Sequence, residues 1–315
     1  MTDMDKNPFV SVIIVSYNRK DECLECVDSV LRSNYSPLEV IAVDNASIDN
    51  TYAALEERYA AKIKLVRSEK NIYAAGGRNL GARYASGEYL LFIDSDNVID
   101  KEMITYLIEG IRENKELKIG IAGPFTYYKS DRKRLCWLNN SISLVTSHTA
   151  FTGAGAMDDG QYQYQNLNYI TVGHMPNVFM LKKDLFSAVG GIDSDYVMHY
   201  EESDLAEKVK RQGYSVVLFP KAKTWHDLPL RSVRGHKSFT GINTAMVYYV
   251  SRNRVIFMRK NSKGIRLLLF LVLFSNLFLI YNLAVLIMNG KFSLITLVFK
   301  GYADGLSFSI KPKNQ

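Results

Sequence analysis

The chain has 315 residues, of which 47% are hydrophobic and 23% are charged, and its formal net charge is +7. This composition excludes a disordered protein and allows a globular core, in one large domain or in one domain with an appendage. Basic residues are concentrated toward the C-terminal part, which predicts an anionic neighbour, either phosphate groups or a lipid surface. With 3 cysteines and no apparent signal peptide, the main body is expected in the reducing cytosol.

Strands and helices alternate along the first half of the chain. The runs "FVSVIIVSY", "LEVIAVDNAS", "IKLVRS" and "GEYLLFID" predict buried strands, and helical spacing follows the first three. This rhythm predicts an α/β fold with a mostly parallel sheet and helices on both faces. Four polar residues follow or close the predicted strands: Tyr17, Asp44, Ser68 and Asp94. Because ligands bind beyond the carboxyl ends of such strands, we expect these residues along one edge of the sheet.

The middle of the chain is less regular. The run "FTGAGAMDDGQYQYQN" predicts a long surface loop, and a later acidic cluster precedes a helix that is expected to end near Gly213. Cys23 and Cys26 form a C-x-x-C, but no second Cys or His pair lies at the spacing of a zinc site. Because they fall on an amphipathic helical pattern, we interpret them as buried helix residues.

The C-terminal part differs in character from the rest. Residues 231–266 are basic with interleaved aromatic residues, and residues 267–288 carry no charge over about 22 positions, which is long enough to cross a bilayer. Four polar residues interrupt this run: Ser275, Asn276, Tyr281 and Asn282. A membrane-spanning helix, a helix lying in the membrane interface and a buried or dimer-forming helix all stay open. The expected organisation is a catalytic domain at 1–230, a basic amphipathic connection at 231–266 and a hydrophobic tail at 267–315.

The segment Asp94-Ser95-Asp96 ends a strand that is otherwise apolar. Alternate side chains of a strand share a face, so the two carboxylates can converge on one hard cation such as Mg²⁺ or Mn²⁺. A D-x-D alone is a weak signal, because the same residues can simply cap the next helix.

Five segments occur in a fixed order around this motif: "VSVIIVSYNR", "VDNAS", "NIYAAGGRNLG", "FIDSDN" and "VGGIDSDYVMHYEESDL". This ordered set resembles the family 2 glycosyltransferases, which have the GT-A fold, over about residues 9–230. The rhamnosyltransferase-type members, which build polysaccharides or glycolipids, are the most similar in character.

The resemblance implies a donor site and a metal site. The donor-binding residues that it implies are Tyr17, Asn18, Asp44, Arg78, Asn79, Asp94 and Ser95. Among them, Asp44 matches the family residue that contacts the nucleotide base. The metal, Mn²⁺ or Mg²⁺, would be held by Asp94, Asp96 and His226, with Asp96 as the more direct ligand.

The resemblance also implies a catalytic base in the run "YEESDL". We expect Glu202 to be the base, with Glu201 as the second candidate, although acidic residues also simply favour a helix N-terminus. The implied reaction is an inverting, metal-dependent sugar transfer from a UDP-, GDP- or dTDP-sugar to a glycan or polyisoprenyl-linked acceptor. Membrane lipid at the cytoplasmic face is the other expected partner, and no nucleic acid is expected. Arg252 and Asn253 are expected to be structural rather than catalytic.

Two other enzyme activities and one non-catalytic protein are alternative interpretations of the sequence. A sugar-phosphate nucleotidyltransferase would carry a glycine-rich loop near its first strand, and "VSYNRKDE" has no glycine. A dehydrogenase would carry G-x-G-x-x-G after that strand, which is absent. A membrane-tethered binding or scaffold protein of the same fold is the alternative from a different class, and the retained Asp94 and Asp96 argue against it.

Overall fold

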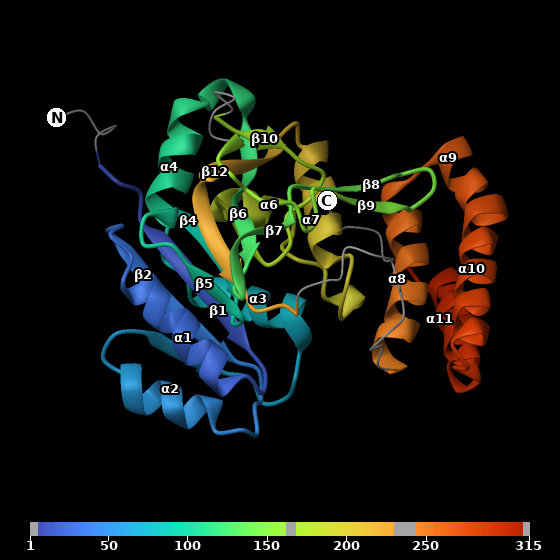
Figure 1. Ribbon diagram of the computed structural model, residues 1–315, viewed down its shortest axis with the longest axis horizontal. Helices are drawn as coiled ribbons and strands as arrows, with labels where there is room; N and C mark the ends of the chain where they lie inside the picture. Colours follow the sequence, from blue (N-terminus) through green and yellow to red (C-terminus); the bar gives the residue numbers. More distant parts are fainter. Residues whose placement is uncertain (1–5, 162–167, 230–243, 311–315) are drawn as a thin grey trace.

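The computed structural model describes residues 6–161, 168–229 and 244–310, and it contains one large sheet with helices on both faces and a helical bundle beside it (Figure 1). The strands are β1 (Val10–Ser16), β2 (Leu38–Asp44), β3 (Lys64–Arg67), β4 (Tyr89–Asp94), β5 (Asn97–Ile99), β6 (Ile119–Tyr128), β7 (Asp131–Trp137), β8 (Asn139–Ile142), β9 (Thr149–Thr152), β10 (Ile170–Thr171), β11 (Val178–Lys182) and β12 (Ser215–His226). The helices are α1 (Lys20–Leu31), α2 (Thr51–Tyr59), α3 (Tyr73–Tyr84), α4 (Met103–Glu113), α6 (Lys183–Ala188), α7 (Glu201–Arg211), α8 (Thr244–Asn261), α9 (Gly264–Leu269), α10 (Ser275–Met288) and α11 (Ile295–Ser307).

The central sheet has the strand order β10-β12-β6-β11-β4-β1-β2-β3. Strands β4, β1, β2 and β3 are mutually parallel, as are β12 and β6, whereas β11 is antiparallel to both of its neighbours. The predicted α/β fold with a mostly parallel sheet is therefore confirmed.

The parallel strands end at the same level. Ser16 lies opposite Asp44, Asp44 lies opposite Arg67, and Val15 lies opposite Asp94. The four strand-end residues singled out above consequently lie along one edge of the sheet, as expected.

Each face of the sheet is covered by its own hydrophobic core. In β1, Val12 and Ile14 pack with α1, α2 and α4 on one face, while Ile13 packs with α3 and α7 on the other. This alternation follows from the period of two along a strand. On the second face, α3 lies so close to β1 that two of its positions have no room for a side chain. A Cβ at Gly77 would lie 2.5 Å from Val15 Cγ1, and one at Gly81 would lie 2.4 Å from Ile13 Cγ2. The close approach places the next residue, Arg78, beneath the strand edge.

The C-terminal helices form a bundle of their own. The hydrophobic run expected at 267–288 lies within one helix, Gly264–Met288, which includes a π-helical turn at Phe270–Phe274 and is long and apolar enough to cross a membrane. Helix α11 packs tightly on α8, and two glycines of α11 make this possible. A Cβ at Gly301 would lie 2.5 Å from the carbonyl oxygen of Tyr248, and a Cβ at Gly305 would lie 2.7 Å from the carbonyl oxygen of Arg252. This close contact makes α8 and α11 one packed unit.

Two regions differ from the expectations. Residues 131–152 contain strands β7, β8 and β9, which the weak alternation of "DRKRLCWLNNSIS" did not predict. The expected loop at 151–166 begins with the end of β9, and its residues 162–167 lie outside the described part of the chain. Cys23 and Cys26 agree with the prediction, since both are buried on α1.

Candidate active site

Asp44 anchors one end of the strand edge. Its side chain is buried, its Oδ1 accepts a hydrogen bond from the Ser47 amide at 3.2 Å, and its Oδ2 lies 3.3 Å from Arg67 Nε. The carboxylate is therefore held in place from two sides. Arg67 was missed from the sequence, although it closes the third predicted strand and the same strand-end argument could have found it.

Tyr17 and Asn18 lie beside Asp44 at the end of β1. The Ile48 amide donates to Asn18 Oδ1 at 2.8 Å, and the Asn18 amide donates to Ser47 Oγ at 3.0 Å. Asn18 thus ties the loop after β1 to the loop after β2, while the Tyr17 side chain is exposed. The predicted nucleotide-binding residues are brought together here.

The two carboxylates of the D-x-D motif point to different partners. Asp94 Oδ1 lies 2.5 Å from Nη2 of Arg78, whereas Asp96 Oδ1 lies 3.2 Å from Nε2 of His226. His226 reaches this position because it ends β12 and pairs with Asn97 of β5. Arg19, which follows β1, lies 3.8 Å from Asp96 Oδ2. The sequence placed Asp96 and His226 in one site, and the structure brings them together.

The surroundings shift the pKa values of both carboxylates in opposite directions. Burial raises the pKa of Asp94, and the nearby Arg78 guanidinium offsets only part of this effect. Burial also acts to raise the pKa of Asp96, but the hydrogen bond and charge of His226, together with Arg19, outweigh it and lower the pKa. Asp96 is therefore the carboxylate that stays ionised more readily.

The donor set around Asp96 fits a hard divalent cation with few protein ligands. Within the described residues, no group of three or more His, Cys, Asp or Glu side chains is arranged to hold a metal. Asp96 and His226 supply one carboxylate and one imidazole, while Asp94 is turned toward Arg78. A carboxylate with an imidazole suits Mn²⁺ better than Mg²⁺, and substrate phosphates and water can supply the remaining ligands of such an ion.

Asn177 contacts the ring of His226. Its Nδ2 lies 2.7 Å from His226 Nδ1 and 3.3 Å from Nε2, so this amide is placed to influence which ring nitrogen carries the proton. Metal binding through Nε2 requires the proton on Nδ1, and a 180° turn of the Asn177 amide would let its oxygen accept that proton. Asn177 was not found from the sequence, where it is an ordinary residue of "HMPNVF".

The acidic motif begins α7 and joins the D-x-D motif through Arg78. Arg78 Nη1 lies 2.9 Å from Glu202 Oε1, so one buried guanidinium holds both Asp94 and Glu202. Glu201 is buried, and its Oε2 has no hydrogen-bond partner among the described residues. Burial, followed by repulsion from Glu202, raises the pKa of Glu201 to about 8.

Asn79 and Ser95 occupy supporting positions. Asn79 donates from Nδ2 to the Ile192 carbonyl at 2.7 Å and accepts from the Ile192 amide at 3.0 Å. Both of its polar groups therefore fasten the loop that leads toward α7, and its predicted donor contact stays a prediction. Ser95 is buried in the turn between the two aspartates, and its donor contact also stays a prediction.

The segment before α7 is held by a residue of the helical bundle. Three non-glycine residues of this segment have positive φ: Val197 (64°), His199 (63°) and Tyr200 (74°). Such backbone costs about 1–3 kcal/mol per residue and persists only where its surroundings enforce it. The buried Asn253 of α8 donates from Nδ2 to the carbonyl oxygens of Tyr196, Met198 and His199, at 2.5, 2.7 and 3.3 Å. Asn253 is thus structural, as expected, and positions the start of α7.

Comparison with known proteins identifies the family. Residues 11–190, more than half of the chain, match the model described as Glycosyl transferase family 2. The chain belongs to glycosyl transferase family 2. Family membership agrees with the ordered motifs, and the site residues of the first half, from Tyr17 to Asp96, all lie within the matched range.

Curated relatives of this glycosyl transferase family 2 chain are bacterial proteins. It is 26% identical over 182 residues to "Glycosyltransferase GlyG" of Streptococcus pneumoniae, covering 57% of this chain and 58% of that one. It is 38% identical over 89 residues to the "UDP-Glc:alpha-D-GlcNAc-diphosphoundecaprenol beta-1,3-glucosyltransferase WfgD" of Escherichia coli, covering 28% of this chain and 35% of that one. The chain therefore spans only part of the length of these relatives, 58% of the first and 35% of the second.

Two solved structures share the fold. GalNAc-T7 with UDP, GalNAc and Mn²⁺ aligns with a TM-score of 0.60 at 15% identity, over 80% of this chain and 50% of that chain. The mannosyltransferase PcManGT from Pyrobaculum calidifontis, in complex with GDP-Man and Mn²⁺, aligns with a TM-score of 0.54 at 17% identity, over 98% of this chain and 90% of that chain. These similarities support the predicted GT-A fold.

Proposed function

We propose that this family 2 chain is an inverting glycosyltransferase that moves a sugar from a nucleotide-diphosphate sugar to a glycan or lipid-linked acceptor. The observation that carries the proposal is the Asp94–Arg78–Glu202 connection, with ion pairs of 2.5 and 2.9 Å. It joins the motif that faces the donor diphosphate to the motif that supplies a base, at the strand edge where α/β proteins bind ligands.

The nucleotide would lie against the ends of β1 and β2. Tyr17 offers an exposed ring for stacking, and the fixed Asp44 carboxylate offers an acceptor for base or ribose N–H and O–H groups. Neither group selects between uracil, guanine and thymine by itself, so UDP-, GDP- and dTDP-sugars all belong in a donor panel.

Asp96 and His226 would hold the divalent cation, Mn²⁺ or Mg²⁺, with Asp94 as a further ligand once it turns away from Arg78. When bound, the cation offsets the negative charge of the departing nucleoside diphosphate. Arg19, beside Asp96, is placed to add positive charge on the same side of the site.

Glu202 would act as the base. In the reaction, the acceptor hydroxyl oxygen forms a bond to C1 of the sugar, the bond from C1 to the diphosphate oxygen breaks, and the hydroxyl proton moves to the carboxylate. Attack from the side opposite the leaving group inverts the configuration at C1. Arg78 holds the Glu202 carboxylate in place, and Asn253 positions the first turn of its helix.

The acceptor side is proposed from the relatives and from the basic C-terminal part. The name of WfgD specifies a diphosphoundecaprenol-linked acceptor for that enzyme. We place the present protein at the cytoplasmic face of the membrane, with a comparable polyisoprenyl-linked or glycan acceptor. The hydrophobic Gly264–Met288 helix supports this location.

Comparing Glu202→Gln with Glu201→Gln tests the reaction. Glu202→Gln should abolish transfer and leave donor binding intact, because the amide keeps the shape but takes no proton. Glu201→Gln should retain much more activity. Full sugar transfer by a folded Glu202→Gln protein would exclude Glu202 as the base. If the unmodified protein neither transferred sugar nor bound a donor, a non-catalytic scaffold protein of the same fold would be favoured instead.

A further inference from the structure

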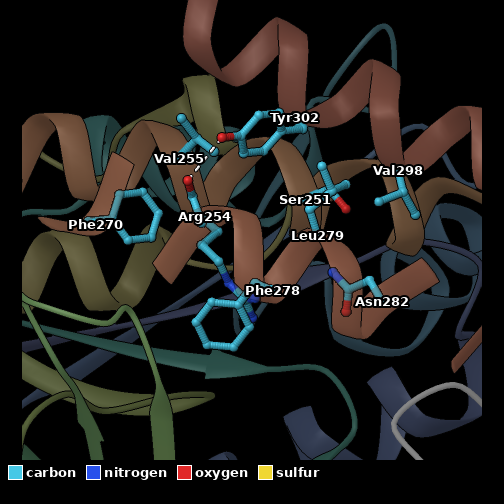
Figure 2. Close-up of a pocket in the computed structure, with 10 residues that line it drawn as sticks. Ser251, Arg254, Val255, Phe270, Phe278, Leu279, Asn282, Val298 and Tyr302 are labelled. Atoms are coloured by element: carbon cyan, nitrogen blue, oxygen red, sulfur yellow. Dashed lines mark hydrogen bonds between the residues drawn. The ribbon is translucent and has the colours of Figure 1, made fainter. Parts of the chain in front are cut away.

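The helical bundle has an exposed, largely apolar surface, on which Asn276 and Tyr281 are the exposed polar residues of the hydrophobic run. Of the helix Gly264–Met288, only 22% of the most apolar window is buried, and large side chains such as Val272, Leu273, Ile280 and Met288 are exposed. Ser275 and Asn282, by contrast, are buried. Asn282 lies among the side chains that line a pocket between α8, α10 and α11 (Figure 2). A soluble protein rarely exposes a continuous apolar surface of this kind without a partner.

Helix α10 runs side by side with the charged helix α8 (Figure 1). Phe270, near one end of the hydrophobic helix, packs with Ile256 and Phe257, while Leu286, near the other end, packs with Val247. The two helices are therefore antiparallel and share packed side chains near both ends, while the most extensive packing of α8 is against α11.

The packing of α8 against the hydrophobic helix favours a helix that lies on the membrane over one that spans it. The guanidinium of Arg254 lies 3.8 Å from the centre of the Phe278 ring, which is close to the midpoint of Gly264–Met288 (Figure 2). The neighbouring Arg252 and Asn253 hold the segment that precedes α7. A spanning orientation would draw these charged groups and the catalytic domain to the middle of the hydrocarbon layer, where charged groups are strongly disfavoured.

Positive charge lies at both ends of the hydrophobic helix. At its start, Lys263 and Arg266 line a cavity of about 680 Å³ together with Arg211 and Lys260, and neither Lys263 nor Arg266 has an ion-pair partner among the described residues. At its other end, Lys291 is exposed. An apolar surface flanked by lysine and arginine matches the interface of an anionic bilayer, with lipid phosphates at the ends and acyl chains along the middle.

We propose that the bundle binds an anionic lipid bilayer in the plane of the membrane, through the exposed surface of Gly264–Met288, and does not span it. This inference deepens the proposed membrane location but is independent of the sugar-transfer chemistry. It keeps the catalytic domain at the headgroup level, where a lipid-linked acceptor presents its sugar.

Vesicle binding tests the surface. Full-length protein would be sedimented with vesicles of pure phosphatidylcholine or of phosphatidylcholine with phosphatidylglycerol. We expect at least tenfold tighter binding to the anionic vesicles, lost in Val272→Glu/Ile280→Glu and weakened about tenfold in Lys263→Glu/Arg266→Glu. The controls Tyr84→Glu and Lys62→Glu/Arg83→Glu change exposed residues of the sheet domain and should bind normally. Equal binding by all variants, or a stable dimer that buries this surface and binds no vesicles, would overturn the proposal.

Side-specific labelling tests the orientation. The native cysteines are buried, so single cysteines introduced as Lys263→Cys and Lys291→Cys, at the two charged ends of the hydrophobic helix, can be probed with a membrane-impermeant maleimide on sealed cytoplasmic-side-out vesicles. An in-plane helix leaves both positions reactive from the outside. Reaction at position 263 alone, with position 291 reacting only after detergent is added, would demonstrate a span and contradict the proposal. Either result is independent of whether sugar transfer is detected.

Discussion

Arg78 offers the sharpest perturbation of the site, because one buried side chain holds two carboxylates from distant parts of the chain. In Arg78→Ala, Asp94 and Glu202 would lose ion pairs of 2.5 and 2.9 Å and face each other without the intervening charge. Breaking a fully buried ion pair costs about 3–5 kcal/mol. Because the Asp94 side chain is 32% exposed, water screens part of this loss, and we expect a fall of roughly 2–4 kcal/mol in the free energy of unfolding.

The variant Arg78→Lys tests whether positive charge at this position is sufficient without the geometry of the guanidinium. Lysine keeps the positive charge but lacks the planar fork that reaches two carboxylates at once, so we expect most of the stability to return while turnover stays at least tenfold reduced. Urea unfolding and nucleoside diphosphate release would be measured for both variants, with Arg83→Ala, an exposed arginine of the same helix, as the control. An Arg78→Ala protein with unchanged unfolding and turnover would refute the role of Arg78 as the link between the two motifs.

Three further changes test other parts of the site. Asp96→Asn should weaken the Mn²⁺ dependence of donor binding at least tenfold, as followed by a titration of metal against thermal shift. Asn253→Ala should lower kcat about tenfold or more with little change in the donor KM, because it releases the strained segment before α7 and leaves the nucleotide-binding end of the site intact. The control Val247→Ala, in the same helix, should leave kcat near normal. Burial raises the pKa of Glu201 to about 8. Between about pH 4.5 and pH 8 the folded protein therefore holds a proton that the unfolded chain releases. The free energy of unfolding should consequently fall as the pH rises through this window. Glu201→Gln should remove that fall in urea unfolding at pH 5 and pH 8, and a persisting fall would exclude Glu201 as its source.

The positions of Asp44 and Asp94 could be predicted because parallel strands have one direction and one register. Once β1, β2 and β4 are recognised as buried strands, their carboxyl ends must meet at one edge, and Asp44 and Asp94 lie there. The resemblance to family 2 glycosyltransferases implied His226 as a metal ligand, and His226 does lie beside Asp96.

The connections through Arg78 and Asn253 could not be predicted in the same way. Arg78 and Glu202 are far apart in sequence, and their contact depends on how closely α3 packs on β1 and where α7 begins. Asn253 bonds to backbone carbonyls, which have no residue signature, from a helix whose docking depends on the packing of α11. Such contacts are set by tertiary packing and leave no local periodicity to read.

The strands β7, β8 and β9 show a related limit. Strand β7 pairs with β6 and strand β8 pairs with β9, and their side chains alternate weakly between polar and apolar. The hydrophobic period that identified the central strands is therefore missing from them.

Donor binding is the measurement that tests the central claim most directly. Full-length protein in detergent would be mixed with UDP-, GDP- and dTDP-sugars in the presence of Mn²⁺, Mg²⁺ or EDTA, and thermal shift and nucleoside diphosphate release would be recorded beside Asp44→Asn and Asp96→Asn. The account predicts metal-dependent stabilisation and turnover with one nucleotide class, weakened in both variants. A folded protein that responds to none of these donors, or equally well in EDTA and in both variants, would contradict it.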